Sequence, residues 1–511
     1  MRKIVSLAVA VSMVVVLGQI GLASSFKILG TRPLGMGGAF VAVAEDAIAQ
    51  YWNPAGFALQ KGFDIQIPVG VGAETTEGLV KEVDDLGDTV SKIQEKQDKG
   101  QAFDEDDIKN FTAAISDLDD LNKSGMGLIL DINAGLNVRY GNLGIGVINI
   151  TELSADPYAD LDHIGLGEMD SDALDALCVD ILGDDVGDDH GDNSSLLTSS
   201  QLDIATDIAD SLSDMGANPG VSGWENQEIA EELVTAGVLA DLSDDEIAVV
   251  AGKIAEVAGL AVLALITGSD FSDNESKVIF NGIMLFEAPV TYARELPWLK
   301  NLYVGGNFKF MYGIVGFHEF KVPSDKDLME SLYRDYRDHT KASTTIGVDV
   351  GALYDLKESL GARFGMVVRN LNYPSFSQSK EAKEVGLDKY VIEPQVRVGA
   401  AYWPLNFITL SADLDLTNNK TVLKGYDSKM FALGAEVNIL NQPWLNLALR
   451  GGFMDNLAES FGSIFTGGLG LNIFHINLDF AAAVSTERTS IGDGEKFPTA
   501  LTGSFGISVN F

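Results

Sequence analysis

The chain has 511 residues, of which 46% are hydrophobic and 54 are glycine, so it can build a large buried or lipid-facing surface. Its formal net charge of −39 excludes a nucleic-acid partner, because nucleic acids bind basic surfaces. A single cysteine, Cys178, excludes an intrachain disulfide and any CxxC redox pair.

Residues 1–23 have the pattern of a secretory signal peptide. Arg2 and Lys3 supply the positive start, and Ile4–Leu17 is an almost unbroken apolar run. Gly21 and Ala23 are small, so we expect cleavage after Ala23. A retained membrane anchor is the alternative, but the apolar run is shorter than the ~20 residues that a spanning helix needs. The sequence therefore predicts export.

Residues 24–61 combine glycines with apolar side chains, most densely in RPLGMGGAFVAVAEDAIAQYWNPAG, which spans Arg32–Gly56. Glycine permits close backbone packing and positive φ, and Asn-Pro initiates a turn. A flexible linker is the alternative, but the interleaved Phe40, Val41, Tyr51 and Trp52 favour a packed segment. The residues expected to build it are Gly35, Met36, Gly37, Gly38, Asn53, Pro54 and Ala55.

Residues 62–511 predict amphipathic β-strands. In the final stretch, apolar side chains at positions 501, 505, 507, 509 and 511 alternate with small or polar ones, which is typical of a strand with one apolar face. Each such segment is close in length to the ~10 residues that a tilted strand needs to cross a bilayer. The even number of segments is typical of bacterial barrels. The fourteen predicted strands cover 62–73, 126–139, 142–152, 278–293, 300–318, 341–356, 359–370, 390–403, 406–417, 427–440, 443–455, 461–474, 476–486 and 498–511.

The connections between these strands alternate in length. Long ones follow the odd strands, with a moderate one after the eleventh, and short ones such as Tyr140–Gly141 and Gln442–Pro443 follow the even strands. Outer-membrane barrels have short periplasmic turns and longer external loops. We therefore expect a closed antiparallel barrel, all-β and transmembrane, with both ends of the barrel chain in the periplasm. A soluble β-sandwich is the alternative, and it predicts no such alternation.

Two connections are large and acidic. Thr75–Ser124 contains 14 acidic and 6 basic residues, and Glu152–Ser276 contains 30 acidic residues and one basic residue, Lys253. Almost all of the net charge is therefore carried there. Apolar residues recur at helical spacing, as in Leu79, Val83 and Leu86, so we expect two acidic α-helical insertions, 74–125 and 153–277.

The chain ends on an aromatic residue, Phe511, at the end of an alternating strand. This ending resembles the signal by which the outer-membrane assembly machinery recognises its clients. The assembly machinery and outer-membrane lipid are therefore expected partners.

The stretch Arg32–Gly56 resembles the N-terminal hatch of the FadL/OMPP1 long-chain fatty acid transporter superfamily. That superfamily includes PorV-like proteins and barrel proteins labelled "conjugal transfer protein TraF". The resemblance is strong over about thirty N-terminal residues, looser over strands such as Ala448–Leu457, and does not cover the acidic insertions. It implies that residues 24–61 enter a fourteen-stranded barrel from the periplasm and plug it. The thioredoxin-like TraF of the F plasmid uses chemistry that a chain with one cysteine lacks.

Seven charged residues at inward positions of the predicted strands are expected to face the lumen, where they either tune a pore or form ion pairs that fill the interior. They are Arg363, Arg397, Arg450, Glu393, Asp413, Glu436 and Asp479. No Ser/His/Asp or Cys/His set stands out among five scattered histidines, so enzyme activity, a cofactor and a metal site are not expected.

Two functions fit this sequence. The first is an outer-membrane channel that takes up hydrophobic small molecules through a barrel gated by the N-terminal hatch. The second is a docking or assembly protein that uses its acidic external insertions as a partner surface. An apolar path through the barrel favours the first function, and a blocked lumen that carries an ordered insertion favours the second.

Overall fold

The computed structural model describes residues 25–76, 121–160, 275–321, 339–442, 444–459, 462–491 and 495–511, together with residues 79, 197–199, 201–202, 205–206 and 231. The predicted signal peptide (1–23) and most of the two predicted acidic insertions (74–125 and 153–277) lie outside the described residues. Among the described residues, no helix is both long and apolar enough to cross a membrane.

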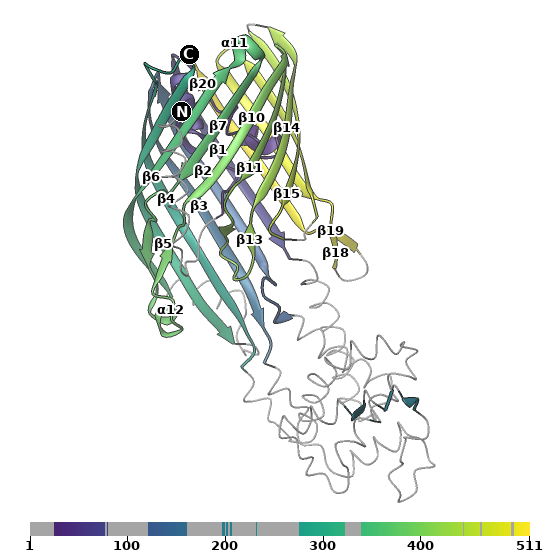
Figure 1. Ribbon diagram of the computed structural model, residues 1–511. Coiled ribbons are helices and arrows are strands. Elements are labelled where there is room, and N and C mark those ends of the chain that lie inside the picture. The colour runs from purple at the N-terminus through teal and green to yellow at the C-terminus, as the bar shows by residue number, and fades with distance from the viewer. Residues whose placement is uncertain are drawn as a thin grey trace, which may run out of the picture.

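Fourteen antiparallel strands within the described residues form a closed barrel, which confirms the predicted architecture (Figure 1). The last strand pairs with the first, so the wall has no open edge and its backbone groups are satisfied, as hydrocarbon requires. The wall strands are β1 (Phe63–Thr75), β2 (Leu128–Tyr140), β3 (Leu143–Tyr158), β4 (Lys277–Glu295), β5 (Leu302–Lys321), β6 (Thr340–Leu356), β7 (Ala362–Arg369), β10 (Gln395–Leu405), β11 (Ile408–Asp415), β14 (Met430–Gln442), β15 (Leu445–Asn456), β16 (Ile464–Ile473), β17 (Ile476–Ser485) and β20 (Ala500–Asn510).

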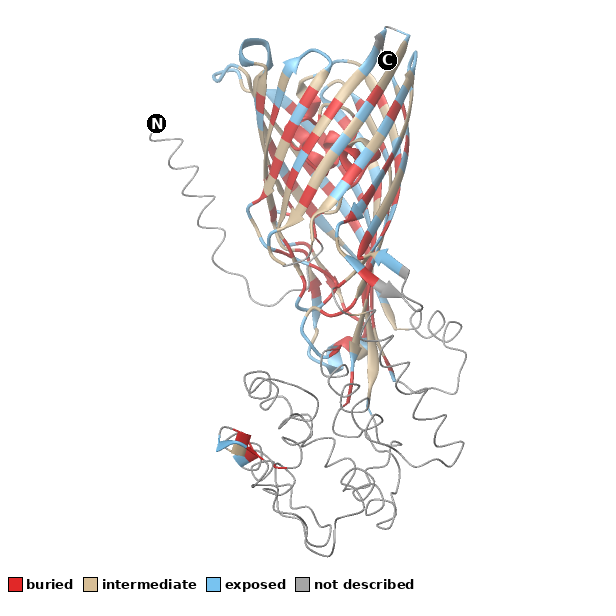
Figure 2. Cartoon of the chain, turned by 90° about the vertical axis from the view of Figure 1, so that its right-hand side faces the viewer, coloured by how far each residue is buried: buried red, intermediate tan, exposed pale blue. Residues whose placement is uncertain are grey.

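Side chains alternate between the outside and the inside of the wall. On β1, Val69 and Val71 are 48% and 59% exposed, whereas their neighbours Gly70 and Gly72 are buried. Figure 2 shows the same alternation of buried and exposed positions along the other strands. The exterior is therefore apolar, as a surface in contact with lipid must be.

Exposed aromatic side chains gather at the end of the barrel with the short turns. Tyr140, Trp298, Trp444 and Phe474 lie at or beside four of these turns, and all are more than half exposed. The C-terminus and the short helix α11 (Lys357–Leu360) lie at the same end (Figure 1). An aromatic rim of this kind marks the membrane interface of outer-membrane barrels.

Within the described part of the chain, three two-stranded hairpins lie in the long connections at the opposite end (Figure 1). They pair β8 (Ser375–Ser377) with β9 (Lys389–Val391), β12 (Asn419–Lys420) with β13 (Asp427–Ser428), and β18 (Arg488–Ile491) with β19 (Glu495–Pro498). The helix α12 (Lys380–Glu384) lies between β8 and β9. Residues 370–394 and 416–429, which hold the first two hairpins, are called the outer cap below.

Two predicted strands begin too early. The wall strands start at Gln395 and Met430 rather than at residues 390 and 427. Pro394 cannot donate a ladder hydrogen bond, and the residues before it pair with β8 instead. Residues 427 and 428 likewise pair with β12, so the alternation in sequence continues although the strand partner changes.

The wall is uneven in height. The strands β4 and β5 have 19 and 20 residues, whereas β7 and β11 have 8 each. Only about 9–11 residues are needed to cross a bilayer. One side of the wall therefore rises well beyond the membrane, and β3 on that side runs past its predicted end at residue 152 to Tyr158.

Residues 25–62, called the N-terminal segment below, precede the wall. They contain α2 (Thr31–Gly35), α3 (Ala49–Trp52) and the 3₁₀ helix η2 (Pro54–Ala58). In Figure 1 this purple segment lies between the barrel walls. The helix α2 contacts β15, β16, β17 and β20, and η2 contacts β4, β5 and β6, so the segment touches both sides of the lumen.

Candidate functional site

The N-terminal segment has its own aromatic core inside the barrel. The rings of Phe26, Phe40, Tyr51 and Trp52 pack with centroid distances of 5.4–5.9 Å. The Trp52 indole donates to the Leu29 carbonyl at 2.8 Å, so its one polar group is satisfied. All four side chains are at least 97% buried, and the segment is therefore a compact body rather than a loose linker.

The glycines of the LGMGGA stretch let this body approach the wall backbone. Gly37 has φ of +63°, which favours glycine, and its N–H donates to the Thr466 hydroxyl at 3.0 Å. On the wall, a Cβ at Gly434 or Gly452 would collide with the backbone of Met36 or Gly37. Glycine is thus required on both sides of this contact. Gly35 lies against Gly468 and Arg450, and Gly38 also has positive φ.

The Asn-Pro turn contacts the opposite side of the wall. Asn53 is fully buried, and its amide group donates to the carbonyls of Val41 at 3.2 Å and Ala352 at 3.1 Å. Its side-chain oxygen accepts from the N–H of Ala55 and so caps η2. Pro54 packs where the wall strand β5 has a glycine, Gly305, whose Cβ would meet the Pro54 carbonyl group.

A buried carboxylate on β11 holds the middle of the segment. Asp413 accepts hydrogen bonds from the backbone N–H groups of Phe40 and Val41, both at 2.8 Å. Two positions earlier on the same face of β11, the Ser411 hydroxyl donates to the Ala39 carbonyl at 2.8 Å. These contacts fix three successive residues of the segment against one strand.

A two-pronged ion pair joins α2 to the wall. Arg32 binds both oxygens of Glu436 at 2.8 Å, and Glu436 also accepts from Arg450 at 2.7 Å. Arg450 in turn donates to Asp479 at 2.5 Å, so a chain of alternating charges runs along the inner wall. Burial opposes the charge on Arg32, but Glu436 outweighs it and holds the pKa of Arg32 above its ordinary value.

Two further arginines predicted to face the lumen are 2% exposed. Arg363 binds Glu45 of the segment and Asp355 of β6, both at 3.1 Å. Arg397 forms a two-pronged pair with Asp415, and its guanidinium lies 4.0 Å from the Phe26 ring centroid. Both arginines therefore join the wall to the segment rather than lining open water.

A second buried ion network was not singled out from the sequence. Lys309 contacts Glu287 at 2.9 Å and Asp349 at 3.0 Å, and Arg369 contacts Glu287 at 3.1 Å. Arg369 also lies 3.7 Å from the ring centroid of Tyr51. Each charged residue sits at an inward position of its strand, so strand periodicity predicts its direction. Its partners are on other strands, and periodicity does not specify them.

Glu393 and Phe511 take different places from the other predicted residues. Glu393 precedes β10 and lies in the outer cap, so it is outside the wall strands. Burial raises the pKa of its carboxyl, and the nearby Lys420 opposes this shift. Phe511 exchanges backbone hydrogen bonds with Phe63 at 2.8 and 3.1 Å, next to the seam that closes the barrel, and is 69% exposed. Its role in assembly stays a prediction.

A cavity of about 330 Å³ lies between α2 and the wall strands at the end with the short turns. Charged side chains line much of it, including Arg32, Asp46, Arg139, Glu436 and Asp479. Such a lining suits water and polar solutes. Burial raises the pKa of Asp46, although Arg32 opposes this shift.

The outer half of the lumen is apolar instead. Inward residues of β2, β4 and β5, including Ile129, Ile283 and Met311, pack against Phe376 and Leu423 of the outer cap. These five side chains are 2% exposed or less. The described lumen thus has two layers, a charged layer around the N-terminal segment and an apolar layer beneath the outer cap.

A closed antiparallel barrel with an apolar exterior and an aromatic rim defines an outer-membrane β-barrel protein. The model of the family described as "F plasmid transfer operon, TraF, protein" matches residues 50–415, and the chain belongs to that family. This match confirms the resemblance to TraF-labelled barrel proteins. No curated protein sequence matches the chain.

Several solved structures resemble the chain at low sequence identity. The Ralstonia pickettii toluene transporter TbuX has a TM-score of 0.43 at 12% identity, covering 94% of this chain and 98% of its own. The P. putida toluene transporter TodX has a TM-score of 0.43 at 9% identity, with coverages of 95% and 99%. A Pseudomonas aeruginosa FadL homologue has a TM-score of 0.40 at 8% identity, with coverages of 96% and 99%.

Proposed function

We propose that this protein is an outer-membrane channel for small hydrophobic molecules and that its N-terminal segment is the hatch that opens and closes it. The observation that carries the proposal is that a compact N-terminal segment, whose peptide link to the barrel is at the start of β1, is otherwise attached to the inner wall only by non-covalent contacts among the described residues. Arg32, Glu45 and Asn53 each contact a different part of the wall.

The apolar layer supports a hydrophobic solute. A solute that passes the outer cap would meet side chains such as Ile283, Met311 and Val315, which offer dispersion contacts and no polar partner. The polar cavity at the other end would then release it toward water. The barrel fold points to a role other than catalysis.

A reversible lock tests the hatch. The hydroxyl oxygens of Thr31 in α2 and Ser504 on β20 lie 2.9 Å apart, so a Thr31→Cys/Ser504→Cys pair is placed to form a disulfide in a Cys178→Ser background. Uptake of a labelled fatty acid or alkylbenzene into liposomes should fall on oxidation and return on reduction. The two single-cysteine variants are the matched controls. Undiminished uptake by fully cross-linked protein would show that the segment is not the gate.

A docking function is the second candidate, and the uneven wall favours it. The tall strands β3 and β4 flank the connection 159–276, which carries most of the chain's negative charge. A rigid stalk that presents an acidic insertion beyond the membrane suits a basic protein partner. If reconstituted protein transports neither probe and retains no apolar molecule detectable by mass spectrometry, docking becomes the better account.

A further inference from the structure

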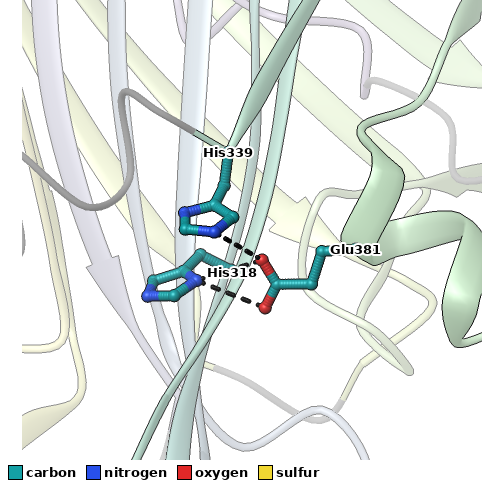
Figure 3. A group of neighbouring side chains, drawn as sticks. All are labelled: His318, His339 and Glu381. Atoms are coloured by element: carbon teal, nitrogen blue, oxygen red, sulfur yellow. Dashed lines mark hydrogen bonds and ion pairs between the residues drawn. The ribbon is translucent and has the colours of Figure 1, made fainter.

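Two histidines and a glutamate meet at the outer end of the wall, far from the charged layer of the lumen. His318 lies on β5, His339 directly precedes β6, and Glu381 lies on α12 of the outer cap (Figure 3). One ligand atom from each residue lies within 4.8 Å of the other two. The residues are 21 and 42 positions apart in sequence, so only the fold brings them together.

The geometry points to a site for a divalent transition metal, with Zn²⁺ as the best-matched ion. Glu381 Oε2 lies 3.1 Å from His318 Nδ1 and 3.4 Å from His339 Nε2. Tetrahedral Zn²⁺ with bonds of about 2.0–2.1 Å places neighbouring ligand atoms about 3.3–3.4 Å apart. Both distances fall near this value. The two imidazoles are stacked with centroids 4.2 Å apart, so one ring would have to turn for both nitrogens to face a single ion.

The donor set selects the class of metal. Imidazole nitrogen suits Zn²⁺, Cu²⁺ and Ni²⁺, whereas Ca²⁺ and Mg²⁺ prefer oxygen ligands alone. Two imidazoles and one carboxylate leave the fourth position for water, as in open zinc sites. The side chains of His318, Glu381 and His339 are 14%, 24% and 38% exposed, so an ion can reach them from solvent.

Neighbouring groups hold the carboxylate in place. The backbone N–H of Glu319 donates to Glu381 Oε1 at 2.9 Å, which leaves Oε2 directed at both histidines. Ser379 caps α12 by accepting from Ala382 and so fixes the turn that carries Glu381. The Glu319 side chain pairs with Lys277 at 2.9 Å and does not enter the cluster. Such supporting contacts are typical of metal sites.

A bound ion would join the outer cap to the tallest part of the wall. His318 and His339 belong to β5 and the start of β6, and Glu381 belongs to the cap. The metal would therefore hold the cap over the apolar layer. This consequence for access rests on the proposed channel function, whereas the metal binding itself does not.

Calorimetric titration of EDTA-treated, full-length protein with Zn²⁺ in detergent tests the site directly. We expect one site that is weakened at least about tenfold by His318→Ala, by His339→Ala and by Glu381→Gln. Because acidic insertions also collect cations loosely, the measurement is the difference between wild type and variant. His475→Ala, in a turn at the opposite end of the barrel, is the matched control and should bind as wild type does.

Limited proteolysis provides a second readout that does not depend on transport. Zn²⁺ should slow trypsin cleavage at Lys380, Lys383 and Lys389 of the outer cap in wild type and should not do so in Glu381→Gln. Heat-modifiable migration verifies that each variant is folded, and Glu381→Gln keeps the size of the side chain. Equal Zn²⁺ affinity and equal protection in wild type and Glu381→Gln would overturn the proposal, whether or not the channel transports an apolar solute.

Discussion

The two layers of the lumen are closed by different physical means. The N-terminal segment is held by directional contacts, such as the ion pair between Arg32 and Glu436 and the backbone donors that meet Asp413. The outer cap adds an apolar layer, in which Phe376 and Leu423 cover inward side chains of β4 and β5, to hydrogen bonds such as that from Asn281 to the Val422 carbonyl at 2.9 Å. Charged and hydrogen-bonded contacts require one register, whereas apolar contacts tolerate small shifts. Under the proposed function, this difference would suit the N-terminal segment to a gate and the outer cap to a cover that adjusts.

Removal of the segment should have the largest effect. We expect a chain that lacks residues 32–56 to form a closed barrel, because the wall strands bond to one another. Ion conductance in planar bilayers should rise strongly, since inward residues such as Arg397 and Asn446 would then line open water. Substituting Asn53 and Pro54 together should give a milder rise, because it loosens the turn without emptying the lumen.

The matched comparison for this deletion is removal of residues 380–386 from the outer cap. If the segment is the main barrier, that variant should conduct little more than wild type. Equal conductance of the two deletions would place the barrier in the cap instead.

Apolar packing in the cap should give the next largest effect. Phe376 is 1% exposed, and its ring fills the space left by Gly313 on β5. Phe376→Ala should weaken the cap by about 3–5 kcal/mol and speed trypsin cleavage at Lys380 and Lys389, while conductance stays at the wild-type level. Phe497→Ala, at a position that is 46% exposed, is the control and should leave cleavage unchanged.

Loss of the shared carboxylate should loosen the segment. Glu436→Gln removes the negative charge between Arg32 and Arg450, and both guanidinium groups would lose their charged acceptor. We expect a cost of about 3 kcal/mol, because breaking a buried pair costs ~3–5 kcal/mol and Arg32 keeps some exposure. The temperature of the heat-modifiable shift should fall, and brief openings should appear in bilayers. Glu384→Gln, on the exposed face of α12, is the control. If both variants show the same shift temperature and the same conductance, Glu436 does not hold the segment.

An ion pair on the outer cap should have the smallest effect. Lys420 and Asp427 are 3.4 Å apart, and the Lys420 side chain is 51% exposed. Lys420→Gln should change stability by less than ~1 kcal/mol, because solvent and salt screen exposed pairs. The same unfolding assay should therefore separate this variant clearly from Glu436→Gln. A comparable loss of stability in Lys420→Gln and Glu436→Gln would mean that burial does not determine how much these ion pairs contribute.

Much of the wall was predictable from the sequence. Alternation with a period of two gives each strand one apolar face, and the alternating connection lengths give the antiparallel order and the common end of the short turns. The predictions erred near Glu393 and Asp427, where the alternation continues while the partner strand changes from the wall to a small hairpin. Periodicity describes which way a side chain points and contains no information about the strand beside it.

The sequence by itself determined that this chain forms a barrel of fourteen strands that is apolar on the outside, because these properties follow from local patterns of side chains, and it predicts export. Only the tertiary structure decided which inward groups meet. Arg32 and Glu436 are separated by 404 positions, and His318 lies beside Glu381 across 63 positions. Such pairs depend on the strand register of the whole barrel and on the path of the segment inside it. A local pattern fixes neither of these, and both the contacts of the N-terminal segment and the cluster of His318, His339 and Glu381 depend on them.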